Sequence, residues 1–130
     1  MNTKILLIDD DADDQFIFTD AVHEIAAGIE CVTVNNGLEA LNYLKTIDQK
    51  PSLIFLDLNM PIMNGFECLE RIKNEDQFKE IPVIIFTTSN NSLDEKRTKK
   101  LGAHVFFTKT PNFKLLKEKL LNILKTHSLA

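Results

Sequence analysis

Five carboxylates stand within six residues directly after the first apolar run of this 130-residue chain. They are Asp9, Asp10, Asp11, Asp13 and Asp14. Capping and the dipole of a following helix account for the last three. They account poorly for Asp9 and Asp10, because these two abut a fully apolar strand and repel each other. Since carboxylate oxygens suit a hard divalent cation such as Mg²⁺, the pair predicts a metal site.

A third acidic position, Asp57, follows the apolar run 53–56. A role as a helix cap does not explain Asp57 well, because a loop separates Asp57 from the next helical segment. Three carboxylates that converge without a cation are costly, because like charges at short range disfavour ionisation. Asp57 therefore strengthens the prediction of a cation if the fold brings it to Asp9 and Asp10.

Hydroxyl and amine side chains follow two later apolar runs. Thr87, Thr88 and Ser89 stand after one run, and Lys109 stands just after the other. Capping of the next helix explains Ser89 at least as well as a functional role does. A lone lysine is usually solvated, but an acidic cluster attracts one at its rim. Together, the acidic pair, the third acidic residue, the hydroxyls and the lysine suit phosphoryl transfer. In that reaction one carboxylate becomes an acyl phosphate, and the other groups bind the phosphoryl oxygens.

The elements that must position these groups alternate along the chain. Apolar runs span 4–8, 30–34, 53–56, 83–86 and 104–107. Such runs are typical of strands buried on both faces, and helical periodicity fills the gaps between them. The weakest helical segment is 92–100, where Leu93, Arg97 and Leu101 form one line among polar residues. Five β-α units predict an α/β fold of the flavodoxin-like (βα)5 type: a five-stranded parallel sheet in the order 2-1-3-4-5, with helices on both faces.

That strand order brings the acidic positions together. The chemistry of such sheets gathers at the carboxyl ends of the strands, at the point where the strand order reverses. The third strand lies beside the first in this order, so we expect Asp57 to come close to Asp9 and Asp10.

Composition excludes several classes of protein. The chain is 44% hydrophobic and 26% charged, as globular domains are, and its net charge of −4 offers no basic surface for nucleic acid or anionic membranes. Apolar runs of roughly six residues are too short to span a membrane, and no secretory signal opens the chain. The cysteines, Cys31 and Cys68, lack metal-ligand spacing and fit a reducing compartment, so we expect a cytoplasmic protein.

In these motifs the chain resembles the receiver domain of bacterial two-component response regulators. The resemblance runs from Lys4 to about Lys125 and rests on residues 5–10, 56–61 with 64–65, 82–87, and Lys109. Thirty residues separate Asp57 from Thr87 and twenty-two separate Thr87 from Lys109, which makes the ordered set highly specific. We expect residues 1–130 to form a single receiver domain without an output domain.

The resemblance implies a phosphoacceptor and a magnesium site. Asp57 would accept a phosphoryl group from the phosphohistidine of a sensor histidine kinase or a histidine phosphotransfer protein. Asp10, Asp57 and the backbone carbonyl of Asn59 would coordinate Mg²⁺, while Asp9 would act mainly through metal-bound water. The domain would have no dedicated enzyme activity beyond catalysing its own phosphorylation and dephosphorylation.

The resemblance also implies how phosphorylation is transmitted. Lys109 and Thr87 would each bind a phosphoryl oxygen. Phe106 stands at the family's switch aromatic, which turns inward when Thr87 moves. The fourth helix, fifth strand and fifth helix would then present a changed face to a downstream protein, and a homodimer through that face is compatible with the sequence.

Two positions depart from the family pattern. Proline usually follows the lysine across a cis peptide bond, whereas here Thr110 follows Lys109 and Pro111 comes one residue later. We expect the cis bond to be kept at this functional site, although a cis bond before a residue other than proline costs about 3 kcal/mol. Thr88 replaces a smaller residue and is expected to narrow access to Asp57.

Other functions fit the sequence less well. A haloacid-dehalogenase-type phosphatase needs an acid two residues after its nucleophile, where this chain has Asn59. No glycine-rich motif for a flavin or nucleotide occurs. The serious alternative is a receiver-fold interaction module that no longer accepts phosphate. The run 81–91 resembles stand-alone regulators, some of which are partners of phytochrome-type kinases.

Overall fold

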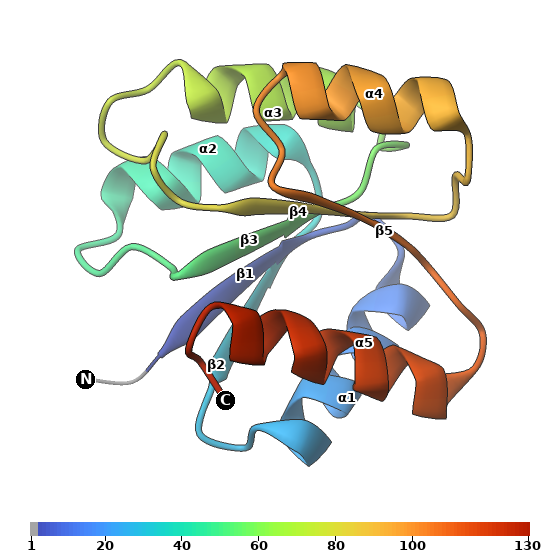
Figure 1. Cartoon of the computed structure of the whole chain (residues 1–130). Coiled ribbons are helices and arrows are strands. Elements are labelled where there is room, and N and C mark those ends of the chain that lie inside the picture. Colours follow the sequence, from blue (N-terminus) through green and yellow to red (C-terminus); the bar gives the residue numbers. More distant parts are fainter. Residues whose placement is uncertain (1–2) are drawn as a thin grey trace.

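The computed structural model describes residues 3–130 and shows an α/β sandwich of three layers (Figure 1). Its strands are β1 (Lys4–Ile8), β2 (Glu30–Val34), β3 (Leu53–Leu56), β4 (Val83–Thr87) and β5 (Val105–Thr108). Its helices are α1 (Ala12–Ile25), α2 (Gly37–Thr46), α3 (Gly65–Lys73), α4 (Ser92–Lys100) and α5 (Phe113–Thr126). All strand pairs are parallel and the order is β2-β1-β3-β4-β5, which confirms the predicted fold.

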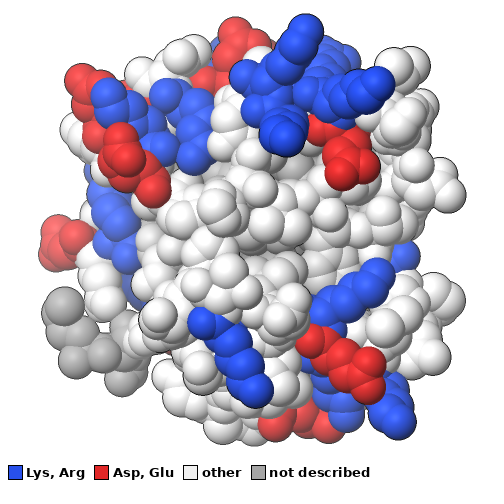
Figure 2. Space-filling view, in the orientation of Figure 1, with Lys and Arg blue, Asp and Glu red and all other residues white. Residues whose placement is uncertain are grey.

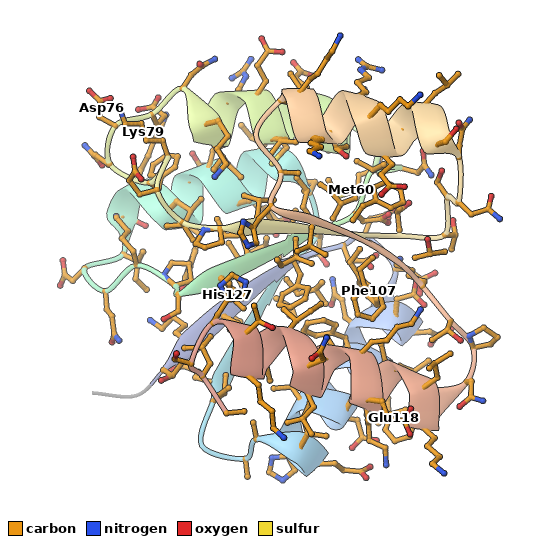
Figure 3. All side chains as sticks on the ribbon, in the orientation of Figure 1. Met60, Asp76, Lys79, Phe107, Glu118 and His127 are labelled. Carbon is orange, nitrogen blue, oxygen red and sulfur yellow. The ribbon has the colours of Figure 1, made fainter. Side chains whose placement is uncertain are left out.

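Each face of the sheet carries its own hydrophobic core. Helices α2, α3 and α4 lie over one face, and α1 and α5 cover the other (Figure 1). Successive side chains of a strand point to opposite faces, so every residue of β1, β3 and β4 is buried. Leu6 belongs to the core under α2 and α3, whereas Leu7 belongs to the core under α1 and α5. Figure 3 shows Phe107 between the sheet and α5.

Aspartate or asparagine caps the amino end of each helix and fixes where it begins. The caps are Asp11, Asn36, Asn64, Asn91 and Asn112, and each side chain accepts a hydrogen bond from a backbone N–H two or three residues later. Proline suits the first turn of a helix, and Pro111 is close to the start of the last one. In the structure, however, Pro111 precedes the Asn112 cap, and α5 begins at Phe113.

Helix α4 is oriented differently from the sequence prediction. Leu93 is 69% exposed, whereas Thr98 is buried and Leu101 packs against the core. The line of residues through Leu93 and Arg97 is therefore not the buried face. The short side chain of Thr98 donates a hydrogen bond to the Glu95 carbonyl at 3.0 Å, so its hydroxyl is satisfied inside the helix. None of the described helices combines the length and apolar character of a membrane span.

Two histidines meet near the end of α5. The ring centroids of His104 and His127 are 5.0 Å apart, and Figure 3 shows His127 below the sheet at the end of α5. Within the described part of the chain, the buried Nε2 atom of His127 has no hydrogen-bond partner. Burial, and then the neighbouring His104, lower the pKa of His127 because both disfavour its charged form.

This lowered pKa predicts a loss of stability in mild acid. Because the pKa of His127 is lower in the folded chain, its stabilising contribution is present above about pH 6.5, the unfolded value. The contribution is lost as the pH falls through the folded pKa. We expect urea midpoints to fall between about pH 7 and pH 5, and to fall less steeply in His127→Gln. A His23→Gln variant, at an exposed position of α1, should keep the wild-type slope, and equal slopes in all three proteins would contradict the prediction.

Candidate functional site

The carboxyl ends of β1 and β3 bring three acidic side chains together. Ile8 and Leu56 are paired in the sheet, and the Asp57 N–H donates to the Ile8 carbonyl at 3.0 Å. The residues that follow the two strands therefore lie at the same edge. One carboxylate oxygen from each of Asp9, Asp10 and Asp57 lies within 4.8 Å of the others. Asp9 and Asp57 are buried, and Asp10 is exposed.

The backbone around Asp57 is packed tightly against the start of α3. The Leu58 N–H donates to Asp57 Oδ1 at 2.8 Å, and the Gly65 N–H donates to the Leu58 carbonyl at 2.8 Å. A Cβ atom at Gly65 would lie 2.3 Å from the Asp57 carbonyl oxygen and 2.6 Å from the Leu58 Cα. Only glycine allows this approach, and the approach fixes the position of the Asp57 loop.

Asp9 is held at the start of α1. The Asp11 N–H donates to Asp9 Oδ1 at 3.0 Å. The Gln15 amide donates to the Asp9 backbone carbonyl at 2.5 Å and to Asn35 Oδ1 at 2.9 Å. The Asp11 N–H therefore orients the Asp9 carboxylate, and the Gln15 amide holds the Asp9 backbone.

Lys109 extends from the end of β5 into the acidic cluster. Its ammonium lies 2.8 Å from Asp9 Oδ2, 2.7 Å from Asp14 Oδ2 and 3.4 Å from Asp57 Oδ2. Its backbone N–H donates to the Thr87 carbonyl at 2.6 Å. The expected cis bond to Thr110 is wrong, because every described peptide bond is trans. The trans backbone already delivers the ammonium to the carboxylates, and it avoids the cost of about 3 kcal/mol.

Burial and charge shift the protonation of these groups. Burial raises the pKa of Asp9 and of Asp57, although hydrogen bonding or charge from Lys109 lowers it in part. Burial alone would lower the pKa of the Lys109 ammonium. Hydrogen bonds to Asp14 and Asp9, with the charge of Asp57, outweigh burial and raise that pKa. Lysine therefore remains a cation at this site.

The hydroxyls at the end of β4 and just after it occupy three different environments. Thr87 is fully buried, and its Oγ1 accepts a hydrogen bond from the Ser89 N–H at 3.2 Å. Ser89 donates to Asp94 at 2.8 Å and does not cap α4, since Asn91 does. Thr88 is exposed and lines a groove next to Lys109.

Phe106 lies on the α4 side of the sheet. It is paired with Ile85 in the sheet and packs against the core under α2 and α3. With Glu95, Thr98 and Lys99 of α4, it also lines a cavity of about 280 Å³. Phe106 therefore lies between the core on this face of the sheet and α4.

The donor set of the acidic cluster fits a hard cation. It offers carboxylate oxygens only, without sulfur or imidazole, and oxygen ligands suit Mg²⁺ or Mn²⁺. The backbone N–H of Leu58 donates to Asp57 Oδ1, which keeps that carboxylate oriented in the cluster.

Two site residues escape prediction from the sequence. The sequence explains Asp14 by its favourable charge at the start of a helix, yet its carboxylate makes the shortest contact with the Lys109 ammonium. Gln15 belongs to no motif in the sequence, yet its side-chain amide donates to the Asp9 backbone carbonyl. The Asp14 contact leaves no local signal, because Lys109 is 95 residues away and the tertiary fold alone joins the two side chains.

Known proteins with similar sequences are response regulators. The family model of the response regulator receiver domain matches residues 5–121. The chain is 29% identical over 109 residues to the polar-differentiation response regulator DivK of Brucella anthropi, covering 84% of this chain and 85% of DivK. It is 32% identical over 115 residues to the response regulator Rcp1 of Synechocystis, covering 85% of this chain and 78% of Rcp1.

Solved structures show the same similarity over the whole chain. The phosphorylated cyanobacterial phytochrome response regulator RcpA superposes with a TM-score of 0.90 at 32% identity, covering 100% of this chain and 97% of RcpA. The Mn²⁺-bound form of Rcp1 gives a TM-score of 0.83 at 30% identity, covering 95% and 92%. With its fold, its acidic cluster and these similarities, the chain belongs to the response regulator receiver domain family.

Proposed function

We propose that this chain is a phosphoacceptor in two-component phosphorelay signalling and that Asp57 receives the phosphoryl group. One observation carries the proposal: the Lys109 ammonium lies 2.8 Å from Asp9 and 3.4 Å from Asp57, at the sheet edge where the acidic cluster includes the exposed Asp10. The related RcpA has been crystallised in a phosphorylated form. The donor is a phosphohistidine on a histidine kinase or a histidine phosphotransfer protein.

The transfer follows from the chemistry of Asp57. A carboxylate oxygen of Asp57 forms a bond to phosphorus as the P–N bond of the phosphohistidine breaks, and the electron pair of that bond stays on the imidazole. The product is an acyl phosphate. Lys109 offsets charge on one phosphoryl oxygen, and the Thr87 hydroxyl donates to another. Water later hydrolyses the acyl phosphate and regenerates the carboxylate.

A bound Mg²⁺ would offset negative charge on the phosphoryl oxygens. Asp10, Asp57 and the backbone carbonyl of Asn59 would hold it, and Asp9 would contribute through water. The oxygen-only donor set and the Mn²⁺-bound form of Rcp1 support this assignment.

We expect Mg²⁺ to stabilise the folded chain. A cation that binds only the folded state raises the free energy of unfolding by about 1.4 kcal/mol at ten times its dissociation constant. The thermal midpoint should therefore rise with added Mg²⁺, and Asp10→Asn should remove most of the rise. Asp13→Asn, at an exposed position of the same segment, is the matched control. A rise that is the same in both variants would contradict the assignment of Asp10.

Phosphorylation shifts the equilibrium between conformations of the face that α4, β5 and α5 form, and this shift is the output. Thr87 moves toward the phosphoryl group, Phe106 repacks into the space that Thr87 leaves, and α4 changes position. The cavity between Phe106 and α4 supports this route, as does the single buried residue of α4. Arg97 stacks over the Phe66 ring at 3.9 Å, and basic side chains gather over α4 in Figure 2, so the face presents charge to a protein partner.

Intact mass spectrometry tests the proposal. The protein is incubated with acetyl phosphate and Mg²⁺, and in parallel with a chelator in place of Mg²⁺. We expect one added phosphoryl group that requires Mg²⁺ and is released by hydroxylamine. No addition, where a control receiver domain is modified, would overturn the proposal. It would favour the alternative, a receiver-fold interaction module that works without phosphate.

A further inference from the structure

Asp14 makes the shortest contact with the lysine of the candidate site. Asp14 Oδ2 lies 2.7 Å from the Lys109 ammonium, whereas Asp57 Oδ2 lies 3.4 Å from it. Asp9 Oδ2 is the other close partner, at 2.8 Å. In this state the ammonium therefore contacts Asp9 and Asp14 more closely than the proposed phosphoacceptor.

Helix α1 holds Asp14 in place. The Asp14 N–H donates to the capping carboxylate of Asp11 at 3.0 Å, so the residue is part of an ordered first turn. A negative charge in the first turn of a helix is favourable, because it complements the helix dipole. The Asp14 side chain is 33% exposed and lines a groove of about 370 Å³ that also contacts Lys109 and Thr88. Asp14 is thus a fixed charge that solvent and incoming groups reach.

The charge of Asp14 opposes phosphorylation in two ways. Three carboxylates share one ammonium, so a phosphoryl group on Asp57 adds negative charge beside the existing excess. In addition, Lys109 has to exchange a close contact with Asp14 for one with a phosphoryl oxygen. Both effects favour the unphosphorylated state.

We propose that Asp14 is a positioning residue that holds Lys109 in a resting position and thereby slows phosphorylation of Asp57. This inference rests on the proposed phosphoacceptor function. Asp14 then does more than complement the dipole of α1. The strength of its contact with Lys109 helps to determine how readily this receiver is phosphorylated.

The test compares Asp14→Asn with Asp13→Asn and Asp14→Glu. Asp13 is exposed in the same turn and carries the same charge, so its variant controls for the helix dipole. In acetyl phosphate with Mg²⁺, Asp14→Asn should accelerate phosphoryl incorporation about fivefold, while Asp13→Asn stays within about twofold of wild type. Asp14→Glu restores the charge and should return the rate toward that of wild type.

A second readout reports on the lysine itself. Asp14→Asn should increase the fraction of Lys109 acetylated by acetic anhydride in a fixed time, because the Lys109 side chain loses its contact with the Asp14 carboxylate and becomes more accessible. An unchanged or slower phosphorylation rate in Asp14→Asn, or unchanged acetylation of Lys109, would overturn the inference while leaving the phosphoacceptor function in place. A wild-type chain that takes up no phosphoryl group would overturn both.

Discussion

The Asp57→Asn variant is expected to take up no phosphoryl group from acetyl phosphate, under conditions in which the wild-type chain gains one. An amide cannot form the acyl phosphate, because the reaction needs a carboxylate oxygen as the nucleophile. Asp48→Asn, at an exposed position before β3, is the matched control and should be modified like wild type. Intact mass spectrometry of the three proteins measures this directly. Modification of Asp57→Asn to the wild-type extent would show that another residue is the acceptor.

The same variant has an expected effect on stability. Burial raises the pKa of Asp57, so the folded state resists its ionisation. The stabilising contribution of Asp57 is therefore present below its unfolded pKa of about 4 and is lost as the pH rises through the raised value. Without Mg²⁺ at neutral pH, Asp57→Asn should have a higher urea midpoint than wild type. An equal or lower midpoint would mean that Lys109 fully compensates the buried charge.

Replacing Gly65 by alanine is expected to destabilise the fold by about 2 to 3 kcal/mol. The new methyl group would lie 2.3 Å from the Asp57 carbonyl oxygen and 2.6 Å from the Leu58 Cα. Both neighbours are backbone atoms, so relief requires the Asp57 loop or the start of α3 to move. Phosphorylation should also slow in the fraction that folds, because Asp57 is displaced relative to Lys109.

Gly28→Ala is the matched control for this prediction. A Cβ atom at Gly28 has nothing within 4 Å, and Gly28 is not among the residues with positive φ. Its stability should stay the same or rise by a few tenths of a kcal/mol, because alanine restricts the unfolded chain. Urea midpoints of the two variants decide the matter, and a Gly65→Ala midpoint equal to that of Gly28→Ala would contradict the packing described around Asp57.

The strands were predictable because strands buried on both faces consist of consecutive apolar residues. A run such as 53–56 is apolar throughout, since both faces of the strand are covered. The convergence of Asp9, Asp10 and Asp57 then follows from strand order alone. Helix α4 was harder, because only Thr98 is buried in it and its polar residues do not indicate which side faces the sheet.

The contacts of Lys109 could not be predicted in the same way. The contacts with Asp14 and Asp9 join residues 95 and 100 positions apart in the sequence, and no local pattern shows how far the Lys109 side chain reaches into the acidic cluster. The backbone after Lys109 is a further example. The resemblance favoured a cis bond to Thr110, whereas the amide proton of Lys109 bonds to Thr87 and the trans chain positions the ammonium.

The most direct measurement locates the phosphoryl group on the chain. After incubation with acetyl phosphate and Mg²⁺, borohydride reduces an aspartyl phosphate to homoserine, and peptide mass spectrometry identifies the altered position. We predict homoserine at position 57, with Asp9, Asp10 and Asp14 unchanged. Homoserine at another of these positions, or none at 57 in a chain that has gained a phosphoryl group, would contradict the assignment of Asp57 as the acceptor.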